Sequence, residues 1–225
     1  MKLFLDTADI TDISNRVSTG LIDGITTNPT LIMKSSRNPY DVYREITLLG
    51  INDISMEVVG HNAPDYVRQG YELYDKFGDV ATIKLPCTPD GLMACKELSS
   101  RKIRVNITLI FNSAQAVLAA KAGATYVSPF VGRLADNSIS GTKAVEYIAS
   151  LYRKHDVKTQ IIAASIRDVH SVTESFHNGA HVCTIPPSVF DKMYCHVLTD
   201  VGIDTFIKDW EKVEQARTEI NQIKH

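Results

Sequence analysis

Short runs of β-forming residues alternate with longer amphipathic segments along the whole chain. Eight runs are rich in aliphatic, β-branched or aromatic residues, as expected of buried strands. They cover residues 2–6, 24–27, 54–58, 81–85, 103–108, 125–128, 160–164 and 181–185. Between them, apolar side chains recur every three or four positions, as in residues 66–77, which is typical of helices that bury one face. The pattern predicts eight consecutive β–α units.

A strictly alternating β–α order predicts a parallel sheet with helices outside it. Eight units fit a closed (β/α)₈ barrel formed by a single domain. An open doubly wound sheet is the structural alternative, and it usually carries a glycine-rich turn after its first strand when it binds a dinucleotide. Here that turn reads DTADITD, and neither G-x-G-x-x-G nor G-x-x-x-x-G-K occurs in the chain. The pattern favours the barrel, without a nucleotide cofactor.

The last part of the chain departs from the β–α pattern. Residues 203–225 read as one long amphipathic helix that contains the single tryptophan, Trp210. We interpret residues 1–225 as one barrel domain with this helix as its carboxyl-terminal extension. The helix either packs on its own barrel or reaches a neighbouring subunit.

Composition and charge narrow the class of protein. Hydrophobic residues make up 44% of the chain and charged residues 22%, which is ordinary for a globular protein. The net charge of −2 provides no general attraction for nucleic acid or anionic membranes. No apolar run approaches the roughly 18 residues of a membrane-spanning helix, and Asp6 interrupts the amino terminus too early for a secretory signal. These features predict a cytoplasmic protein.

The cysteines do not suggest a metal site or a disulfide framework. Cys87, Cys95, Cys183 and Cys195 show no C-x-x-C spacing. We interpret them as reduced thiols, and we expect no metal and no other cofactor.

Polar side chains lie at the carboxyl ends of the first seven predicted strands. In a barrel of this kind those ends carry the catalytic groups. The residues are Asp6, Thr26, Thr27, Asn28, Glu57, Lys84, Asn106, Thr108, Ser128, Arg133, Ser165 and Arg167. Because parallel strands end at the same rim, the pattern predicts one active site there.

Each of these residues also has a purely structural explanation. Asp6 can cap the following helix, and Asn28, which precedes Pro29, can shape a turn. Glu57 and Lys84 can form an ion pair inside the barrel. The others can be satisfied core groups, turn residues or solvated charges: Asn106, Thr108, Ser128, Arg133 and Arg167. Their shared position at one rim favours the functional interpretation.

A lysine in the strand-like stretch ATIKLPCT suggests covalent chemistry. Burial can make a lysine amine nucleophilic near neutral pH, and an amine with carboxylates nearby fits imine formation with a ketone. Lys84 would be the nucleophile. Asp6 would take the proton of the hydroxyl whose carbon leaves, and Glu57 would assist proton transfers through a water molecule.

The remaining rim residues predict a phosphorylated polyol substrate. Neutral amides and alcohols hold substrate hydroxyls without competing for the proton, and Asn28, Asn106 and Ser128 fit that role. Guanidinium groups match phosphate oxygens. Arg133, Ser165 and Arg167 would therefore form a phosphate clamp, in the late loops where such barrels often bind phosphate.

Six ordered motifs resemble those of the transaldolases. They are FLDTAD, GITTNPTLI, IKLP, VNITLIF, SPFVGR and AASIR, and they run from Lys2 to about Pro187. Together they are specific, although each alone is weak. The length is similar to that of the small single-domain branch, which also includes fructose-6-phosphate aldolases.

The resemblance implies a (β/α)₈ TIM barrel with Lys84 as Schiff-base residue and Asp6 as general acid/base. It implies transfer of a dihydroxyacetone unit from sedoheptulose 7-phosphate to glyceraldehyde 3-phosphate, as in the pentose phosphate pathway. We count Glu57 and Thr108 with the catalytic residues, and Thr26 and Phe130 with the substrate-binding ones. Small members of the family commonly form homo-oligomers, decamers of two five-membered rings, in which the carboxyl-terminal helix crosses to a neighbour.

Two positions distinguish the branches within this resemblance. The aldolases carry Gln in place of Glu57 and Tyr in place of Phe130, and that tyrosine helps to protonate the enamine. Phe130 offers no proton, which favours transfer to an acceptor aldehyde, and Arg167 favours phosphorylated substrates. The alternatives are a fructose-6-phosphate aldolase, a phosphosugar isomerase or epimerase without an imine lysine, and a non-catalytic sugar-phosphate binding protein.

Overall fold

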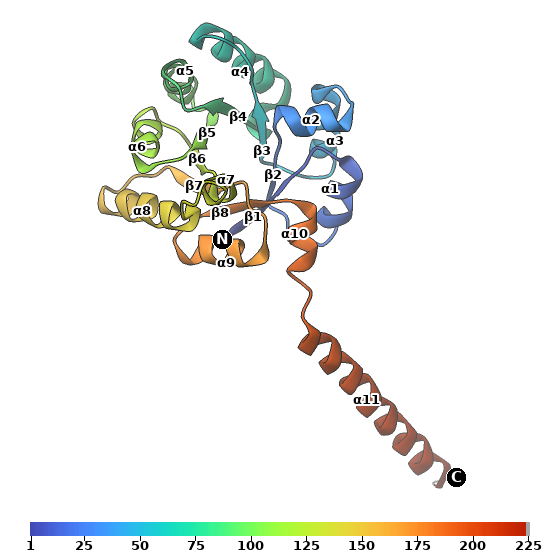
Figure 1. Cartoon of the computed structure of the whole chain (residues 1–225). Helices are drawn as coiled ribbons and strands as arrows, with labels where there is room; N and C mark the ends of the chain where they lie inside the picture. Colours follow the sequence, from blue (N-terminus) through green and yellow to red (C-terminus); the bar gives the residue numbers. More distant parts are fainter. Residues whose placement is uncertain (224–225) are drawn as a thin grey trace. The chain divides into compact units, whose positions relative to one another are not determined.

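The computed structural model describes residues 1–223, and its strands close into a parallel barrel (Figure 1). Each strand pairs with the next in sequence, and β8 pairs with β1. The strands are β1 Lys2–Asp6, β2 Gly24–Thr26, β3 Ile54–Glu57, β4 Ala81–Pro86, β5 Arg104–Ile110, β6 Tyr126–Pro129, β7 Gln160–Ala163 and β8 Val182–Ile185. The predicted (β/α)₈ barrel is confirmed, with strand boundaries within two residues of those expected.

Helices connect the strands and surround the barrel (Figure 1). They are α1 Ile10–Val17, α2 Pro29–Ser35, α3 Pro39–Leu48, α4 Ala63–Phe77, α5 Pro89–Ser100, α6 Ser113–Lys121, α7 Val131–Ala135, α8 Gly141–Lys154, α9 Val169–His177 and α10 Pro187–Lys192, with a 3₁₀ turn at Gly78–Val80. The helix predicted over residues 66–77 is thus confirmed as most of α4.

Side-chain caps and glycines set the helix ends. The side chain of Asn62 accepts the backbone N–H of Asp65 at the start of α4. Gly123 follows α6 with φ of 86°, a conformation that favours glycine. At α1 the cap is Asp9 rather than Asp6, because the helix begins only at Ile10. The capping explanation for Asp6 is therefore wrong, which leaves its carboxylate for the barrel interior.

Residues 191–225 form a compact unit separate from residues 1–190. Its main element is α11, Val197–Ile223, which starts earlier than the expected residue 203. Residues 224–225, the end of the predicted helix, lie outside the described residues. Leu198, Phe206 and Trp210 are exposed on α11. Within residues 1–223, no helix is both long enough and apolar enough to cross a bilayer. Packing of α11 on a neighbouring subunit stays a prediction.

The barrel interior changes from apolar to polar along its axis. One buried cluster, toward the amino ends of the strands, consists of Phe4, Tyr126, Ile162 and Val182. Toward the carboxyl ends, even-numbered strands contribute Thr26, Lys84, Ser128 and Thr184, and odd-numbered strands contribute Asp6, Glu57 and Thr108. Such barrels normally fill these layers with branched aliphatic side chains. The upper layers are thus built for chemistry, while the aliphatic shell between strands and helices supplies the hydrophobic stabilisation.

A buried carboxylate ties together the amino ends of four strands. Asp53, just before β3, accepts hydrogen bonds from Thr82 Oγ1, Arg104 Nη1 and Tyr126 OH, each at 2.8 Å. Burial and this carboxylate raise the pKa of Tyr126, so its hydroxyl stays a donor. Arg104 also donates to the backbone carbonyl of Asn52. This network closes the end of the barrel that lies opposite the polar layers.

We predict that Asp53→Ala lowers the free energy of unfolding by about 3–5 kcal/mol, because it leaves Arg104 without its buried partner. Tyr126→Phe removes only one hydrogen bond and should cost about 1 kcal/mol. Urea unfolding monitored by circular dichroism measures both values. Equal losses for the two variants would show that the carboxylate is not the centre of the network.

Candidate active site

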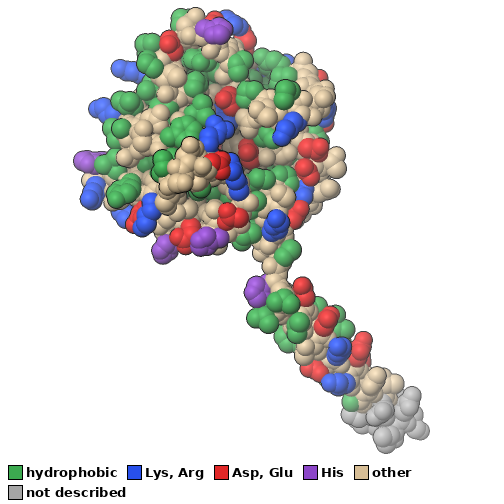
Figure 2. All heavy atoms as spheres, viewed as in Figure 1, with side chains coloured by type: hydrophobic (Ala, Val, Ile, Leu, Met, Phe, Trp, Pro, Cys, Tyr) green, Lys and Arg blue, Asp and Glu red, His purple; other side chains and the backbone are tan. Residues whose placement is uncertain are grey.

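A small polar cavity opens at the carboxyl ends of the strands. Its volume is about 110 Å³, and a neighbouring cavity of about 370 Å³ shares part of its lining. The smaller cavity is lined by Asp6, Thr26, Asn28, Lys84, Asn106, Thr108, Ser128, Phe130, Arg133, Ala164, Ser165 and Thr184. Figure 2 shows basic and acidic side chains side by side on the barrel, close to where α7 lies in Figure 1. The predicted rim thus forms a real cavity.

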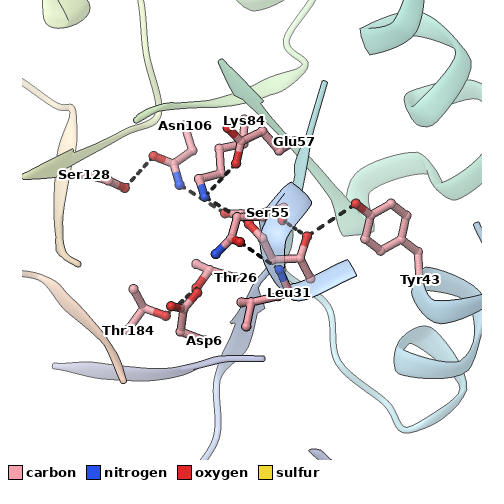
Figure 3. Close-up of polar contacts among 12 residues, drawn as sticks. Asp6, Thr26, Leu31, Tyr43, Ser55, Glu57, Lys84, Asn106, Ser128 and Thr184 are labelled. Carbon is pink, nitrogen blue, oxygen red and sulfur yellow. Dashed lines mark hydrogen bonds and ion pairs between the residues drawn. The ribbon is translucent and has the colours of Figure 1, made fainter. Parts of the chain in front are cut away.

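Lys84 is the buried amine at this cavity. Lys84 is only 5% exposed to solvent. Its Nζ atom lies 3.0 Å from Glu57 Oε2 and donates a hydrogen bond to the backbone carbonyl of Thr27 at 2.9 Å (Figure 3). Glu57 and Lys84 are neighbours because β3 and β4 pair in that register. Two acceptors fix the amine in position, and the carboxylate is close enough to receive its proton.

Asp6 lies on the same side of the cavity as Thr26 and Thr184 in Figure 3. Thr26 Oγ1 donates to Asp6 Oδ1 at 2.8 Å. Burial raises the pKa of the Asp6 carboxyl, and the charge of Lys84 and the Thr26 hydrogen bond only partly oppose this. A carboxylate with a raised pKa accepts a substrate proton more readily, as a general base must.

Asn106 and Ser128 form a fixed pair of neutral polar groups. Ser128 Oγ donates to Asn106 Oδ1 at 2.7 Å, and Asn106 Nδ2 donates to Ser55 Oγ at 3.1 Å. Both ends of the amide are therefore engaged, which sets its orientation. Because Asn106 and Ser128 also line the cavity, they combine the structural explanation with the predicted contact to substrate hydroxyls.

Thr108 leaves a polar atom without a partner. Its Oγ1 is buried and has no hydrogen-bond partner among the described residues, although it lines the cavity. A buried, unsatisfied hydroxyl is costly, so it is well placed to bind a substrate atom or a water molecule. The next residue, Leu109, has φ of 58° beside a shift in the register between β5 and β6. Strained backbone of this kind often occurs at functional sites.

Asn28 has two roles. Its Oδ1 accepts the backbone N–H of Leu31 at 3.0 Å and caps α2, so its structural role is that of a helix cap rather than the expected turn residue. The residue still lines both cavities, next to Lys84. The amide nitrogen therefore remains the atom available to a substrate hydroxyl.

Phe130, Arg133 and Ser165 form the outer part of the cavity. The Arg133 guanidinium lies 4.9 Å from the centroid of the Phe130 ring and makes no ion pair with any residue that the structure describes. Ser165 adopts φ of 58°. Gly132 makes this arrangement possible, because a Cβ there would lie 2.0 Å from the Ser165 carbonyl oxygen. An exposed cation beside a hydroxyl is a suitable place for a phosphate.

Arg167 is placed differently from the prediction. It does not line either cavity and forms an ion pair with Asp136, which follows α7. Both side chains are about half exposed. Asp136 could not be singled out from the sequence, since its approach to Arg167 depends on how α7 packs. In this state the proposed phosphate clamp contains Arg133 and Ser165 but not Arg167.

Of the thirteen residues predicted for the site, counting Phe130, eleven line the two cavities, and Thr27 and Arg167 do not. Ser55 and Thr184 were missed. Both lie at inward-facing positions of strands. Ser55 lies in ISME of β3, two residues before Glu57, and Thr184 lies in VCTI of β8. The period of two along a strand would have identified them.

A cavity of about 800 Å³ lies between α6 and α8, and no predicted site residue is among the described residues that line it. Among residues 1–223, no cluster of three or more His, Cys, Asp or Glu could hold a metal ion. All four cysteines are free. The polar cavity is therefore the best-supported active site.

Comparison with known proteins agrees with this geometry. Residues 3–220 match the family described as transaldolase/fructose-6-phosphate aldolase. The chain belongs to this family. A "Probable transaldolase" of Nitrosopumilus maritimus is 47% identical over 98% of this chain and 99% of its own length. Proteins with the same name from Paracoccus denitrificans and Aquifex aeolicus are 47% and 45% identical, each over 96% of this chain and 99% of their own lengths.

Membership of the transaldolase/fructose-6-phosphate aldolase family fits the position of Lys84. The strand that carries it, β4, is paired on both sides, by β3 and β5, so the amine cannot be a surface group. Lys84 is therefore not a solvated surface lysine. Its ion pair with Glu57 is present, but it lies inside the cavity rather than in a sealed core.

We predict that Asp6→Asn changes the pH dependence of stability. A raised pKa means that the folded chain binds the proton more tightly than the unfolded chain, so wild-type stability falls as pH rises above the ordinary value of 3.8 through the folded value. The variant lacks this loss. Its melting temperature relative to wild type should therefore increase between pH 4 and pH 8.

Differential scanning calorimetry across that pH range measures this difference. Asp156→Asn, a change at an exposed carboxylate, serves as control and should give a difference that varies little with pH. A flat profile for Asp6→Asn would contradict the burial cost assigned to this carboxyl.

Proposed function

We propose that this protein is a transaldolase that transfers a dihydroxyacetone unit between phosphorylated sugars through an imine on Lys84. The observation that carries the proposal is the buried Lys84 amine, held by Glu57 and the Thr27 carbonyl and facing Asp6 across a cavity. An isomerase or a binding protein has no need for an amine in that position.

The reaction begins with a proton leaving the Lys84 amine toward Glu57, directly or through water. The free amine attacks the ketone carbon of the donor sugar and forms a carbinolamine. Protonation of its hydroxyl, with Glu57 returning the proton, releases water and gives the protonated imine. The unpaired Thr108 hydroxyl is placed to hold the water that moves these protons.

Asp6 then cleaves the sugar. Its carboxylate takes the proton of the hydroxyl on the carbon two positions from the imine carbon, and the electrons of the carbon–carbon bond flow into the imine. An aldose leaves, and an enamine of dihydroxyacetone stays on Lys84. Asn28, Asn106 and Ser128 hold the hydroxyls of this fragment. Return of the proton from Asp6 to an acceptor aldehyde reverses the step with a different sugar.

The outer residues define the substrate class. Arg133 and Ser165, which line the same cavity as Lys84, would hold the phosphate of the aldose part. The donor would be sedoheptulose 7-phosphate or fructose 6-phosphate, and the acceptor glyceraldehyde 3-phosphate or erythrose 4-phosphate. Assembly through the apolar face of α11 into a homo-oligomer, of the decameric type, belongs to the same proposal, as does a cytoplasmic location.

The second candidate is a fructose-6-phosphate aldolase, which the family also contains. Phe130 argues against it. Its ring packs against Phe111 with centroids 5.7 Å apart and has no group that could protonate the enamine. The enamine therefore persists until an acceptor arrives.

We predict that borohydride with fructose 6-phosphate attaches a reduced sugar fragment to Lys84. Mass spectrometry of the digested protein locates the fragment and gives its mass. Lys84→Ala should abolish labelling and transfer, whereas Lys158→Ala, at an exposed lysine, should leave both unchanged. Labelling elsewhere, with full transfer by Lys84→Ala, would rule out the proposed nucleophile.

The same preparation separates the two candidates. Without an acceptor, release of free dihydroxyacetone should be slower than transfer by about 100-fold, the usual contribution of one positioned proton donor. An enzyme-coupled assay for dihydroxyacetone measures this release. Release as fast as transfer would favour the aldolase.

We predict that Asp136→Asn lowers the KM for phosphorylated donors by up to about fivefold, because it frees Arg167 for the phosphate and an exposed ion pair is worth about 1 kcal/mol or less. The KM for unphosphorylated fructose should stay constant. Initial rates over a range of donor concentrations measure both, with Asp156→Asn as control. An equal change in both constants would exclude competition for the phosphate.

A further inference from the structure

Thr184 on β8 is a cavity residue that the reaction outlined above leaves without a role. It is buried, lines the cavity and comes from β8, the strand for which no polar site residue was predicted. Its Oγ1 lies 2.5 Å from Thr26 Oγ1. Figure 3 shows Thr184, Thr26 and Asp6 in contact, from β8, β2 and β1.

Proton counting gives this contact a direction. A threonine hydroxyl has one hydrogen, and that of Thr26 is donated to Asp6 Oδ1. The hydrogen between the two threonines must therefore come from Thr184. The result is a chain in which Thr184 donates to Thr26 and Thr26 donates to the carboxylate. Hydrogen bonds in such a chain strengthen one another in a buried site.

We propose that Thr184 is a positioning residue for the general base: its hydroxyl holds the Thr26 proton on Asp6 Oδ1, which leaves Oδ2 to take the substrate proton. Among the described residues no hydrogen bond to Oδ2 is present, so that oxygen is free to act. This inference rests on the proposed function, because it assigns Asp6 the role of base.

The other charged groups at the cavity do not replace this chain. Glu57 on β3 pairs with Lys84 on β4, and Arg133 on α7 lies at the outer end beside Phe130. Lys84 attracts the Asp6 carboxylate, but a point charge does not select one of its two oxygens. Only the directed hydrogen bond does so, since Thr26 is held between its two neighbours.

The test compares Thr184→Val, which keeps the shape but removes the donor, with Thr184→Ser, which keeps the hydroxyl. Transfer from fructose 6-phosphate to glyceraldehyde 3-phosphate is measured from pH 5.5 to 9. Loss of the donor disfavours the ionised carboxylate, so Thr184→Val should lower kcat by about three- to tenfold at acid pH, the value of one neutral hydrogen bond. The deficit should shrink as pH rises, with KM unchanged within about twofold.

Two matched variants guard against a purely structural effect. Thr184→Ser should retain the wild-type pH profile, and Thr184→Ala should behave like Thr184→Val even if valine packs poorly. Thr82→Val removes a buried threonine that also donates to a carboxylate, Asp53, at the other end of the barrel. It should lose stability without a change in the pH profile. A loss in KM alone, a pH-independent loss in kcat, or equal damage in the serine variant would overturn the proposal.

A readout without turnover separates this inference from the proposed function. Thr184→Val should destabilise the protein more at pH 8, where Asp6 is more ionised, than at pH 4, and Asp6→Asn should abolish that difference. Melting temperatures of the two single variants and the double variant give the coupling. If the effects of the two substitutions on the melting temperature add at every pH, the proposed hydrogen-bond chain from Thr184 to Asp6 is overturned, even in an active enzyme. If the wild-type protein shows no transfer, the proposed function is overturned, and the melting temperatures alone test the role of Thr184.

Discussion

The site depends on one buried contact, that between the Lys84 amine and the Glu57 carboxylate at 3.0 Å. Removing a charged amine from water is expensive unless an opposite charge and further hydrogen bonds compensate. Glu57 provides the charge, and the Thr27 carbonyl provides the hydrogen bond. Tyr43 and the carbonyl of Ser55 hold Thr27 in turn. The amine therefore stays in the barrel, and the same carboxylate that stabilises it can remove its proton.

Polar groups that fill the upper barrel weaken the packing that such a fold normally gains there. Most of them are satisfied by one another, as in the pairs Asn106–Ser128 and Thr26–Thr184. Thr108 is the exception, and its unsatisfied hydroxyl lies in the cavity where a substrate would bind. Stability comes instead from the shell of Ile, Val and Leu side chains between strands and helices and from the Asp53 network at the far end. Chemistry is thus concentrated at one end of the barrel, whereas stability comes from the shell around it and from the opposite end.

Alternation of strands and helices was readable from the sequence because each element type has its own hydrophobic period. Once the strands were placed in this way, Lys84 and Asp6 could be predicted as site residues because they lie near the carboxyl ends of strands. The helix expected from residue 203 begins at Val197 and includes Gly202, because a helix tolerates one glycine at a modest cost. The Arg167–Asp136 ion pair could not be predicted from the sequence, because it depends on the packing of a five-residue helix against the end of β7.

The close approach of Gly132 to the Ser165 carbonyl has a consequence for how such a site can diversify. No side chain fits at position 132, so the backbone of the first turn of α7 is fixed and Arg133 is presented from a rigid support. Changes in sugar preference must then arise at side chains that border this support, such as Phe130 and Asp136. Evolution can change the residues at the mouth of this barrel one by one while the helix that carries Arg133 stays the same.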